Sequence, residues 1–119
     1  MAKNRIVHVE IGGFDGEKNR QFFGELFGWD ISDKSAGYSF DLAPPASLSG
    51  HLVELGAEWG AYVTFYVEVE SADASLARAG ELGGKTLVPP QSLPDNSRFA
   101  WLAAPEGQII GLWEAPADA

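Results

Sequence analysis

The sequence predicts an α+β fold in which a strand, a helix and three further strands occur twice along the chain. Residues 5–11 and 62–69 alternate apolar and polar side chains, which is the period of two expected of a half-buried strand. Each is followed by a segment with apolar residues at helical spacing. Moving the first half along by 56 positions brings the halves into register, with residue 9 on residue 65 and residue 11 on residue 67. This repeat predicts two modules that bury their sheets better together than alone.

The first module begins with a strand whose polar face presents His8 and Glu10. Asp15 is the expected cap of a helix over residues 17–27. Gly28 is expected to end this helix, because glycine readily adopts the left-handed conformation of a C-terminal cap. The other strands of the module are expected at 30–32, 38–42 and 51–55.

The second module is expected to repeat the same order of elements. Ser71 is the expected cap of a helix over residues 72–82. The next strand begins at Lys85, and Pro89 and Pro90 are expected to stop it, because proline cannot donate a hydrogen bond to a neighbouring strand. The last two strands are expected at 98–103 and 108–114.

Length and composition restrict the domain organisation and the function classes. A chain of 119 residues is expected to be a single domain, with module one at about residues 5–57 and module two at about 61–115. The net charge of -9, with only 8 Lys and Arg, argues against nucleic acid and against anionic membranes as partners. There is no cysteine, which excludes disulfides and thiolate chemistry. With no signal-peptide pattern and no stretch of roughly twenty apolar residues, a cytoplasmic protein is expected.

Several motifs, spread over nearly the whole chain, resemble one superfamily. They are His8 with Phe22-Phe23 fourteen residues later, Leu26-Phe27-Gly28-Trp29, Leu82-Gly83-Gly84-Lys85 leading to Pro89-Pro90, and Pro105-Glu106-Gly107 before a last strand ending Leu112-Trp113-Glu114. In this order and spacing they resemble the vicinal oxygen chelate superfamily, which includes glyoxalase I, the bleomycin and fosfomycin resistance proteins and the extradiol dioxygenases. The resemblance implies paired βαβββ modules whose curved mixed sheets surround a cleft. It also implies that the chain can form a homodimer.

The resemblance further implies a metal site. Metal-dependent members of the superfamily hold a divalent ion with four side chains, one from the first strand and one from the last strand of each module. By spacing, these positions are His8, Glu54, Thr64 and Gly111. Imidazole and carboxylate groups suit such ions, but neither Thr64 nor Gly111 can replace them, and a catalytic ion needs about three protein ligands. The loss of two positions favours a site without metal. A shifted ion site using His8, Glu10 and Glu54 is the alternative.

His8 and Glu54 are the candidate catalytic residues, and they are also the metal ligands if an ion is bound. His8 is open to three interpretations: a general base, a remnant of the ligand set, or a hydrogen-bonded polar residue. A buried Glu54 needs a partner, and we favour a hydrogen bond between His8 and Glu54 that satisfies both without metal. His51, at the start of a strand, is expected to be exposed. The residues expected to line a ligand site are Glu10, Leu52, Tyr62, Thr64, Tyr66 and Trp113.

These observations favour a small-molecule-binding member of the superfamily, without a metal cofactor and with an aromatic cleft. Because the protein is strongly acidic, its ligand is expected to be neutral or cationic. Whether it catalyses a reaction stays open. The alternative is a lyase, isomerase or dioxygenase with a divalent ion at His8 and Glu54, completed by Glu10 or water. A third alternative is an interaction module whose cleft is filled by its own side chains.

Overall fold

The computed structural model of the protein describes residues 4–32, 39–43, 49–55 and 58–117. Within these residues the chain divides into two compact units. The N-terminal unit is His8–Thr64, and the C-terminal unit comprises the described residues up to Val7 and those from Phe65 onward. A strand, a helix and three strands follow one another twice, so the predicted α+β fold with two βαβββ modules is confirmed.

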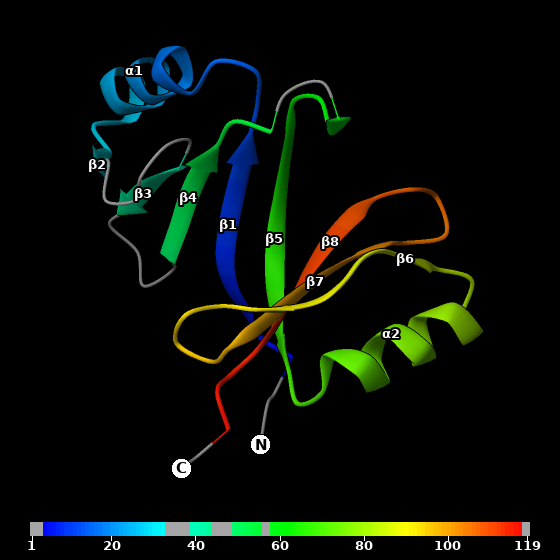
Figure 1. Ribbon diagram of the computed structural model, residues 1–119. Coiled ribbons are helices and arrows are strands. Elements are labelled where there is room, and N and C mark those ends of the chain that lie inside the picture. The colour runs from blue at the N-terminus through cyan, green and yellow to red at the C-terminus, as the bar shows by residue number, and fades with distance from the viewer. Residues whose placement is uncertain (1–3, 33–38, 44–48, 56–57, 118–119) are drawn as a thin grey trace. The chain divides into compact units, whose positions relative to one another are not determined.

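The N-terminal unit contains a mixed sheet with a helix on one face (Figure 1). Its strand order is β2-β3-β4-β1, with β1 and β4 parallel and the other neighbours antiparallel. The elements are β1 (Ile6–Gly12), α1 (Gly16–Phe27), β2 (Asp30–Ser32), β3 (Ser39–Ala43) and β4 (Ser49–Val53).

The core of the N-terminal unit lies between this sheet and α1. Ile11, Ile31 and Leu52 are buried there, and Phe23 and Trp29 pack against them. The helix boundaries follow from local chemistry, because the Asp15 side chain accepts a hydrogen bond from the backbone N–H of Lys18 and Gly28 adopts a left-handed conformation with φ of 70°. Both predicted cap residues are confirmed.

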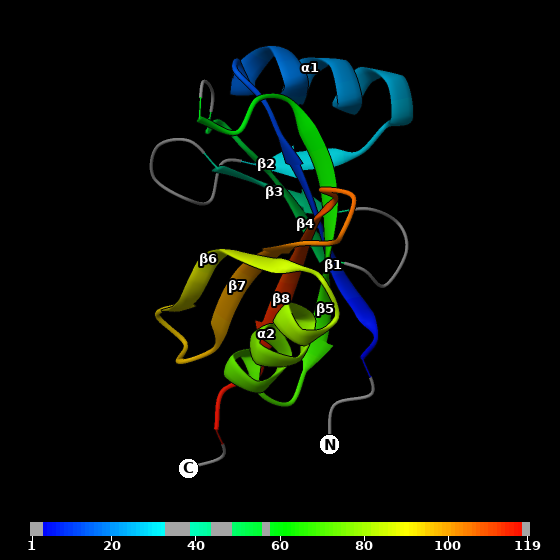
Figure 2. The same cartoon turned by 90° about the vertical axis from the view of Figure 1, so that its right-hand side faces the viewer.

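The C-terminal unit has the same plan, with α2 on one face of its sheet (Figure 2). The strand order is β5-β8-β7-β6, with β5 and β8 parallel. Leu76 of α2 packs on buried Val69, Ala100 and Leu112. Ser71 caps α2 as predicted. The elements are β5 (Tyr62–Val69), α2 (Ala72–Glu81), β6 (Lys85–Ser92), β7 (Arg98–Ala103) and β8 (Ile109–Glu114).

Two predicted strand boundaries were wrong. β6 continues through Pro89 and Pro90 to Ser92 instead of stopping before them. It is the edge strand of its order and has two register shifts, and an edge or a bulge is where a sheet tolerates proline. β4 ends at Val53, so Glu54 lies just beyond the strand. Neither described helix is long and apolar enough to cross a membrane.

Candidate functional site

The candidate site lies on the face of the N-terminal sheet opposite the core. Val9 and Ile11 of β1 point into the core, so the intervening His8 and Glu10 point to the other face. Strand β1 pairs with β4 in parallel, with His8 beside Ser49 and Glu10 beside His51. This register places four polar side chains next to one another.

These side chains form a continuous hydrogen-bonded row. Nδ1 of His8 lies 2.6 Å from Oγ of Ser49, and Nε2 of His8 lies 2.5 Å from Nδ1 of His51. Nε2 of His51 lies 3.1 Å from Oε1 of Glu10. The hydroxyl of Tyr62 donates to Oε2 of Glu10. We call these five residues, Ser49, His8, His51, Glu10 and Tyr62, the polar row.

The polar row runs from exposed Ser49 inward to the buried Glu10, and half-buried Tyr62 closes it. Ser49 is exposed, His51 is 25% exposed, and the Glu10 carboxyl is 3% exposed. A buried carboxylate is costly unless it is hydrogen-bonded, and here both oxygens accept hydrogen bonds. Tyr62 reaches Glu10 because its ring lies directly on Gly12, where a Cβ atom would collide with it. The glycine is therefore required for the row to close at this end.

The hydrogen-bond partners fix the direction of each bond. Ionised Glu10 only accepts, so Nε2 of His51 must carry a proton. With His51 neutral, its Nδ1 accepts from Nε2–H of His8, whose Nδ1 then accepts from the Ser49 hydroxyl.

The comparisons with known proteins place this geometry in a structural context. No family model matches the sequence. Proteins of Mycobacterium tuberculosis and Mycobacterium bovis named "Putative glyoxylase CFP32" are 26% identical over 115 residues, and the match covers 90% of this chain. The chain spans 44% of the length of these relatives.

Solved structures match over almost the whole chain. Methylmalonyl-CoA epimerase from Mycobacterium tuberculosis has a TM-score of 0.67 and 18% identity, over 98% of this chain and 90% of that one. A glyoxalase/bleomycin resistance protein/dioxygenase superfamily member from Vibrio splendidus has a TM-score of 0.67 and 17% identity, over 95% and 100%. The chain therefore has the same fold as this glyoxalase/bleomycin resistance protein/dioxygenase superfamily member and as the epimerase. A methylmalonyl-CoA epimerase variant from Streptomyces coelicolor, with a TM-score of 0.64 and 18% identity, was solved in complex with 2-nitronate-propionyl-CoA.

The strand register corrects one of the four expected metal positions, the one assigned to Glu54. In β5 and β8, Tyr66 pairs with Gly111 in the same way as Glu10 pairs with His51 in β1 and β4. The position in the first module that matches Gly111 is therefore His51, and Glu54 matches Glu114. Counting from each module's last glutamate would have found His51, since it precedes Glu54 by three residues as Gly111 precedes Glu114.

Glu54 has a structural role in this fold. Its Oε1 accepts a hydrogen bond of 2.7 Å from the backbone N–H of Gly16, at the start of α1. Glu114 accepts the equivalent bond from Ala72 at the start of α2. A carboxylate is favourable there because a helix N-terminus has unsatisfied N–H groups and a partial positive charge. The predicted hydrogen bond between His8 and Glu54 was wrong.

The residues of the site do not fit the four-ligand metal centre that the resemblance implies. Glu10 meets His51 at Nε2 and His8 meets it at Nδ1, so these three side chains form a row and do not converge on one point. Thr64 and Gly111 offer neither nitrogen nor carboxylate. Among the residues that the structure describes, no group of three His, Cys, Asp or Glu side chains could hold an ion.

The structure divides the residues predicted to line a ligand site. Glu10 and Tyr62 belong to the polar row. Leu52 is corrected to a core residue, since it is 1% exposed and packs with Ile11 on the helix side of the sheet.

In the C-terminal unit, Tyr66 is likewise a packing residue. Its ring fills the space beside Gly111, and its hydroxyl accepts a 2.7 Å hydrogen bond from Nε1–H of Trp101. Trp113 is half-buried beside Phe99 of β7. Thr64, the last residue of the N-terminal unit, is buried. His51, expected to be exposed, is the central member of the polar row.

Proposed function

We propose that the chain is a small-molecule-binding protein of the superfamily, that it works without a metal ion, and that the polar row makes the polar contacts to its ligand. The observation that supports this is the pairing of His8 with His51. The nitrogens that would have to face an ion instead hydrogen-bond to each other at 2.5 Å. Glu54, the other expected ligand, caps α1.

The charge of the chain narrows the class of ligand. A net charge of -9 lowers the local concentration of polyanions and raises that of cations. Oxygen and nitrogen atoms of the row can exchange hydrogen bonds with a ligand, and Tyr62 adds an aromatic ring. We therefore expect a neutral or cationic ligand with a hydrogen-bonding group next to a planar apolar part. A polyanionic coenzyme A ester is disfavoured.

Metal independence is tested by calorimetric titration of chelator-stripped protein with Ni, Mn, Zn and Fe(II). We expect no binding at micromolar concentration. The variants are His8→Ala and His51→Ala, with Glu54→Ala as the control for the position that sequence spacing favours. Micromolar binding that is lost in both histidine variants and kept in Glu54→Ala would overturn the proposal and support a metal-dependent lyase, isomerase or dioxygenase.

The ligand-binding role is tested on the same proteins with neutral and cationic aromatic compounds. A ligand that binds only the folded state stabilises it by about 2.7 kcal/mol at 100 times its Kd, which is a clear shift in Tm. The chain has two histidines, both in the row, so their imidazole NMR signals are directly assignable. We expect both neutral rings to carry the proton on Nε2, and both to shift on ligand binding. Binding that leaves both rings unchanged would place the ligand elsewhere.

A further inference from the structure

The exposed end of the polar row carries a serine whose hydroxyl contacts an imidazole. Oγ of Ser49 lies 2.6 Å from Nδ1 of His8. Ser49 is exposed, so a molecule in solution can reach it. An alcohol is a weak nucleophile unless a neighbouring base takes its proton, and a hydrogen bond of this length allows that transfer. The contact therefore places a nucleophile and a base at the exposed end of the row.

The rest of the row orients this base. Nε2 of His8 lies 2.5 Å from Nδ1 of His51, and Nε2 of His51 lies 3.1 Å from Oε1 of Glu10. Because Glu10 only accepts, the unprotonated Nδ1 of His8 faces the Ser49 hydroxyl. The buried carboxylate also favours the positive charge that His8 gains with the proton, since charges attract more strongly away from water. Nucleophile, base and orienting groups thus follow one another as in enzymes that use serine, histidine and a carboxylate.

The second module has no such groups at the matching positions. Gly111 matches His51, so the position that matches Ser49 is Ile109, two residues earlier on β8. An isoleucine cannot act as a nucleophile, and a glycine has no side chain with which to orient a base. The strands of the second module therefore pair without this row, and the contact between Ser49 and an imidazole is not a requirement of the fold.

We propose that Ser49 is the nucleophile of an acyl-transfer reaction and that His8 is its general base. His51 and Glu10 are positioning residues, because they act through His8. In the first step, Oγ of Ser49 bonds to the carbonyl carbon of an ester, the bond from that carbon to the leaving oxygen breaks, and Nδ1 of His8 carries the proton from Ser49 to that oxygen. In the second step, water attacks the acyl group, its proton passes through His8 to Oγ of Ser49, and a carboxylic acid leaves.

The chemistry of the row favours a reactive ester as the substrate. Stabilisation of the oxyanion is usually the largest contribution to catalysis of acyl transfer. The row supplies a nucleophile and a base, so the remaining reactivity has to come from a leaving group that is a weak base, such as a phenolate. The net charge of -9 lowers the local concentration of anionic esters. A neutral aryl ester fits best, and this assignment rests on the proposed function, because it makes the ligand of the polar row a substrate.

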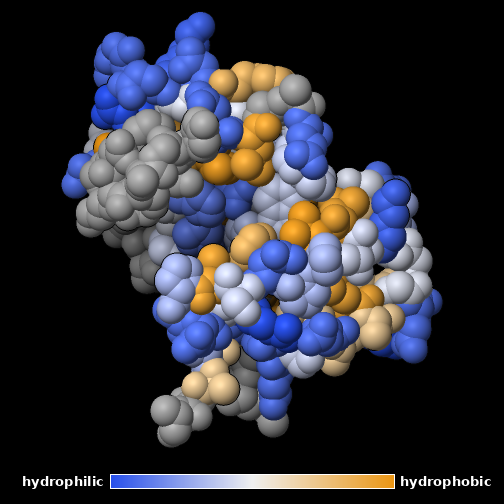
Figure 3. All heavy atoms as spheres, in the orientation of Figure 1, coloured by the Kyte–Doolittle hydropathy of each residue, from blue (hydrophilic) through white to orange (hydrophobic). Residues whose placement is uncertain are grey.

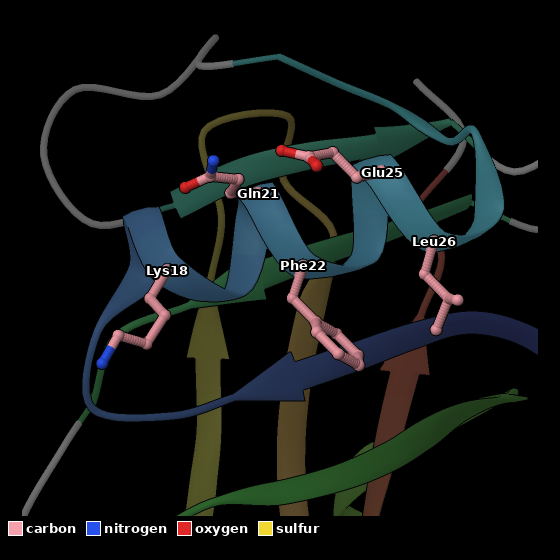
Figure 4. A pocket seen from close by; sticks show the side chains of 5 residues that line it. All are labelled: Lys18, Gln21, Phe22, Glu25 and Leu26. Carbon is pink, nitrogen blue, oxygen red and sulfur yellow. The ribbon is translucent and has the colours of Figure 1, made fainter.

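An apolar hollow on α1, the helix that covers the other face of the sheet, is a competing place for an aryl ester. In this hollow of about 450 Å³, Phe22 and Leu26 are 57% and 59% exposed. Figure 4 shows Lys18 on the same flank of the helix, and a lysine amine also takes an acyl group from a reactive ester. Apolar residues reach the surface elsewhere too, as Figure 3 shows for one face. The residue that reacts therefore has to be mapped.

The nucleophile is tested with an uncharged fluorophosphonate, which forms a stable adduct with an activated serine. Oγ of Ser49 bonds to phosphorus, fluoride leaves, and His8 passes the proton to water. Mass spectrometry of the digested protein should find the label on Ser49, and Ser49→Ala and His8→Ala should remove it. Ser92→Ala is the matched control, because Ser92 is also an exposed serine at a strand end and should not react. A label on Lys18, or equal labelling of both serines, would overturn the proposal.

Hydrolysis of p-nitrophenyl acetate tests the groups behind the nucleophile. We expect Ser49→Ala to lower kcat/KM roughly a hundredfold, and Ser92→Ala and Lys18→Arg to leave it unchanged. Glu10→Gln keeps the size of the side chain and should lower kcat roughly tenfold with little change in KM, because Glu10 is 3% exposed and reaches the ester only through the two imidazoles. Wild-type rates in Ser49→Ala would overturn the proposal.

The nucleophile and the proposed function fail in different ways. A neutral aryl amide, which is too unreactive to be cleaved, should bind and shift the imidazole NMR signals of His8 and His51. That shift without a label on Ser49 would overturn the nucleophile and leave the proposed function standing. No shift and no label would overturn both.

Discussion

The two units place different chemistry at matching positions of the same fold. In the N-terminal unit, Glu10 and His51 pair across neighbouring strands and belong to a hydrogen-bonded row. In the C-terminal unit, the matching pair is Tyr66 and Gly111, where a buried ring packs on a residue without a side chain. One sheet face thus carries titratable groups and the other is filled by packing. A hydrogen-bonded pair of titratable side chains at these positions is therefore a property of the first module alone.

The units share the device that fixes each helix to its sheet. Glu54 lies just beyond the last strand of the first module, and Glu114 is the final residue of the last strand of the second. Each accepts a hydrogen bond from the backbone N–H of the first residue of its module's helix. These bonds tie the ends of the module together. The contact between helix and sheet is therefore the same in both modules, whereas the side chains on the sheet face opposite the helix differ.

The largest expected effect comes from filling the glycine of the packed face. In Gly111→Ala, the new Cβ would lie about 2.5 Å from the Tyr66 ring, which is 6% exposed and cannot move aside. We expect a loss of about 3 kcal/mol in the free energy of unfolding, the upper part of the range for overpacking. In Gly12→Ala, the half-buried Tyr62 can swing away, and the loss should be about 2 kcal/mol, the cost of its hydrogen bond to the buried Glu10 carboxylate. Denaturant unfolding measures both.

Gly80→Ala is the control for this comparison. A Cβ at Gly80 meets nothing within 4 Å, and alanine favours the helix by about 0.5 to 1 kcal/mol. This variant should be as stable as the wild type or more so. If Gly12→Ala cost as much as Gly111→Ala, Tyr62 would be held as tightly as the buried Tyr66.

The sequence was sufficient to predict the frame of both modules. Alternation in β1 and β5, together with the caps Asp15 and Ser71, depends on neighbours in sequence, and local chemistry decides it. The predicted strand at Lys85 was too short. Proline reliably ends a strand only where both edges of the strand are hydrogen-bonded, and β6 is an edge strand. Whether a strand lies at an edge depends on the order of the sheet, which no single segment encodes.

The site was only partly predictable for the same reason. His8 and Glu10 were found because they share a strand. His51 was missed and Glu54 was chosen because strand register is a property of two segments, and a shift of one residue exchanges the faces of a strand. The repeat held the missing information, since the second module contains the same last glutamate at a known distance from Gly111.

A smaller effect is expected from removing the glutamates that cap the helices. Glu114 accepts from Ala72 N–H and also from Nε and an Nη of Arg98 at 3.1 and 3.0 Å. Glu114→Ala should therefore cost about 2 kcal/mol, as for hydrogen bonds to a charged group. Glu54→Ala removes one bond, to Gly16, and should cost about 1 kcal/mol, as for a lost helix cap. Hydrogen exchange should show faster opening of α2 in the first variant and of α1 in the second.

The NMR signals of the two histidines in the polar row provide a control for the Glu54→Ala variant. Glu54→Ala should leave the imidazole NMR signals of His8 and His51 unchanged, because Glu54 bonds to the helix and not to the histidines. A change in those signals equal to that caused by removing Glu10 would mean that Glu54 belongs to the site after all.

The smallest expected effect is a pH dependence of the free energy of unfolding that comes from Glu114 in the C-terminal unit. Hydrogen bonds from Arg98 and from the backbone N–H of Ala72 hold the pKa of Glu114 below its usual value. Because the pKa is lower in the folded state, Glu114 stabilises the fold fully above about pH 4.3, the usual value for Glu, and this contribution is lost as the pH falls through the lowered pKa. The free energy of unfolding should fall more steeply below that pH in the wild type than in Glu114→Gln. The two curves should run parallel above about pH 6, where Glu114 is ionised in both states, and parallel curves down to pH 2 would contradict the assignment.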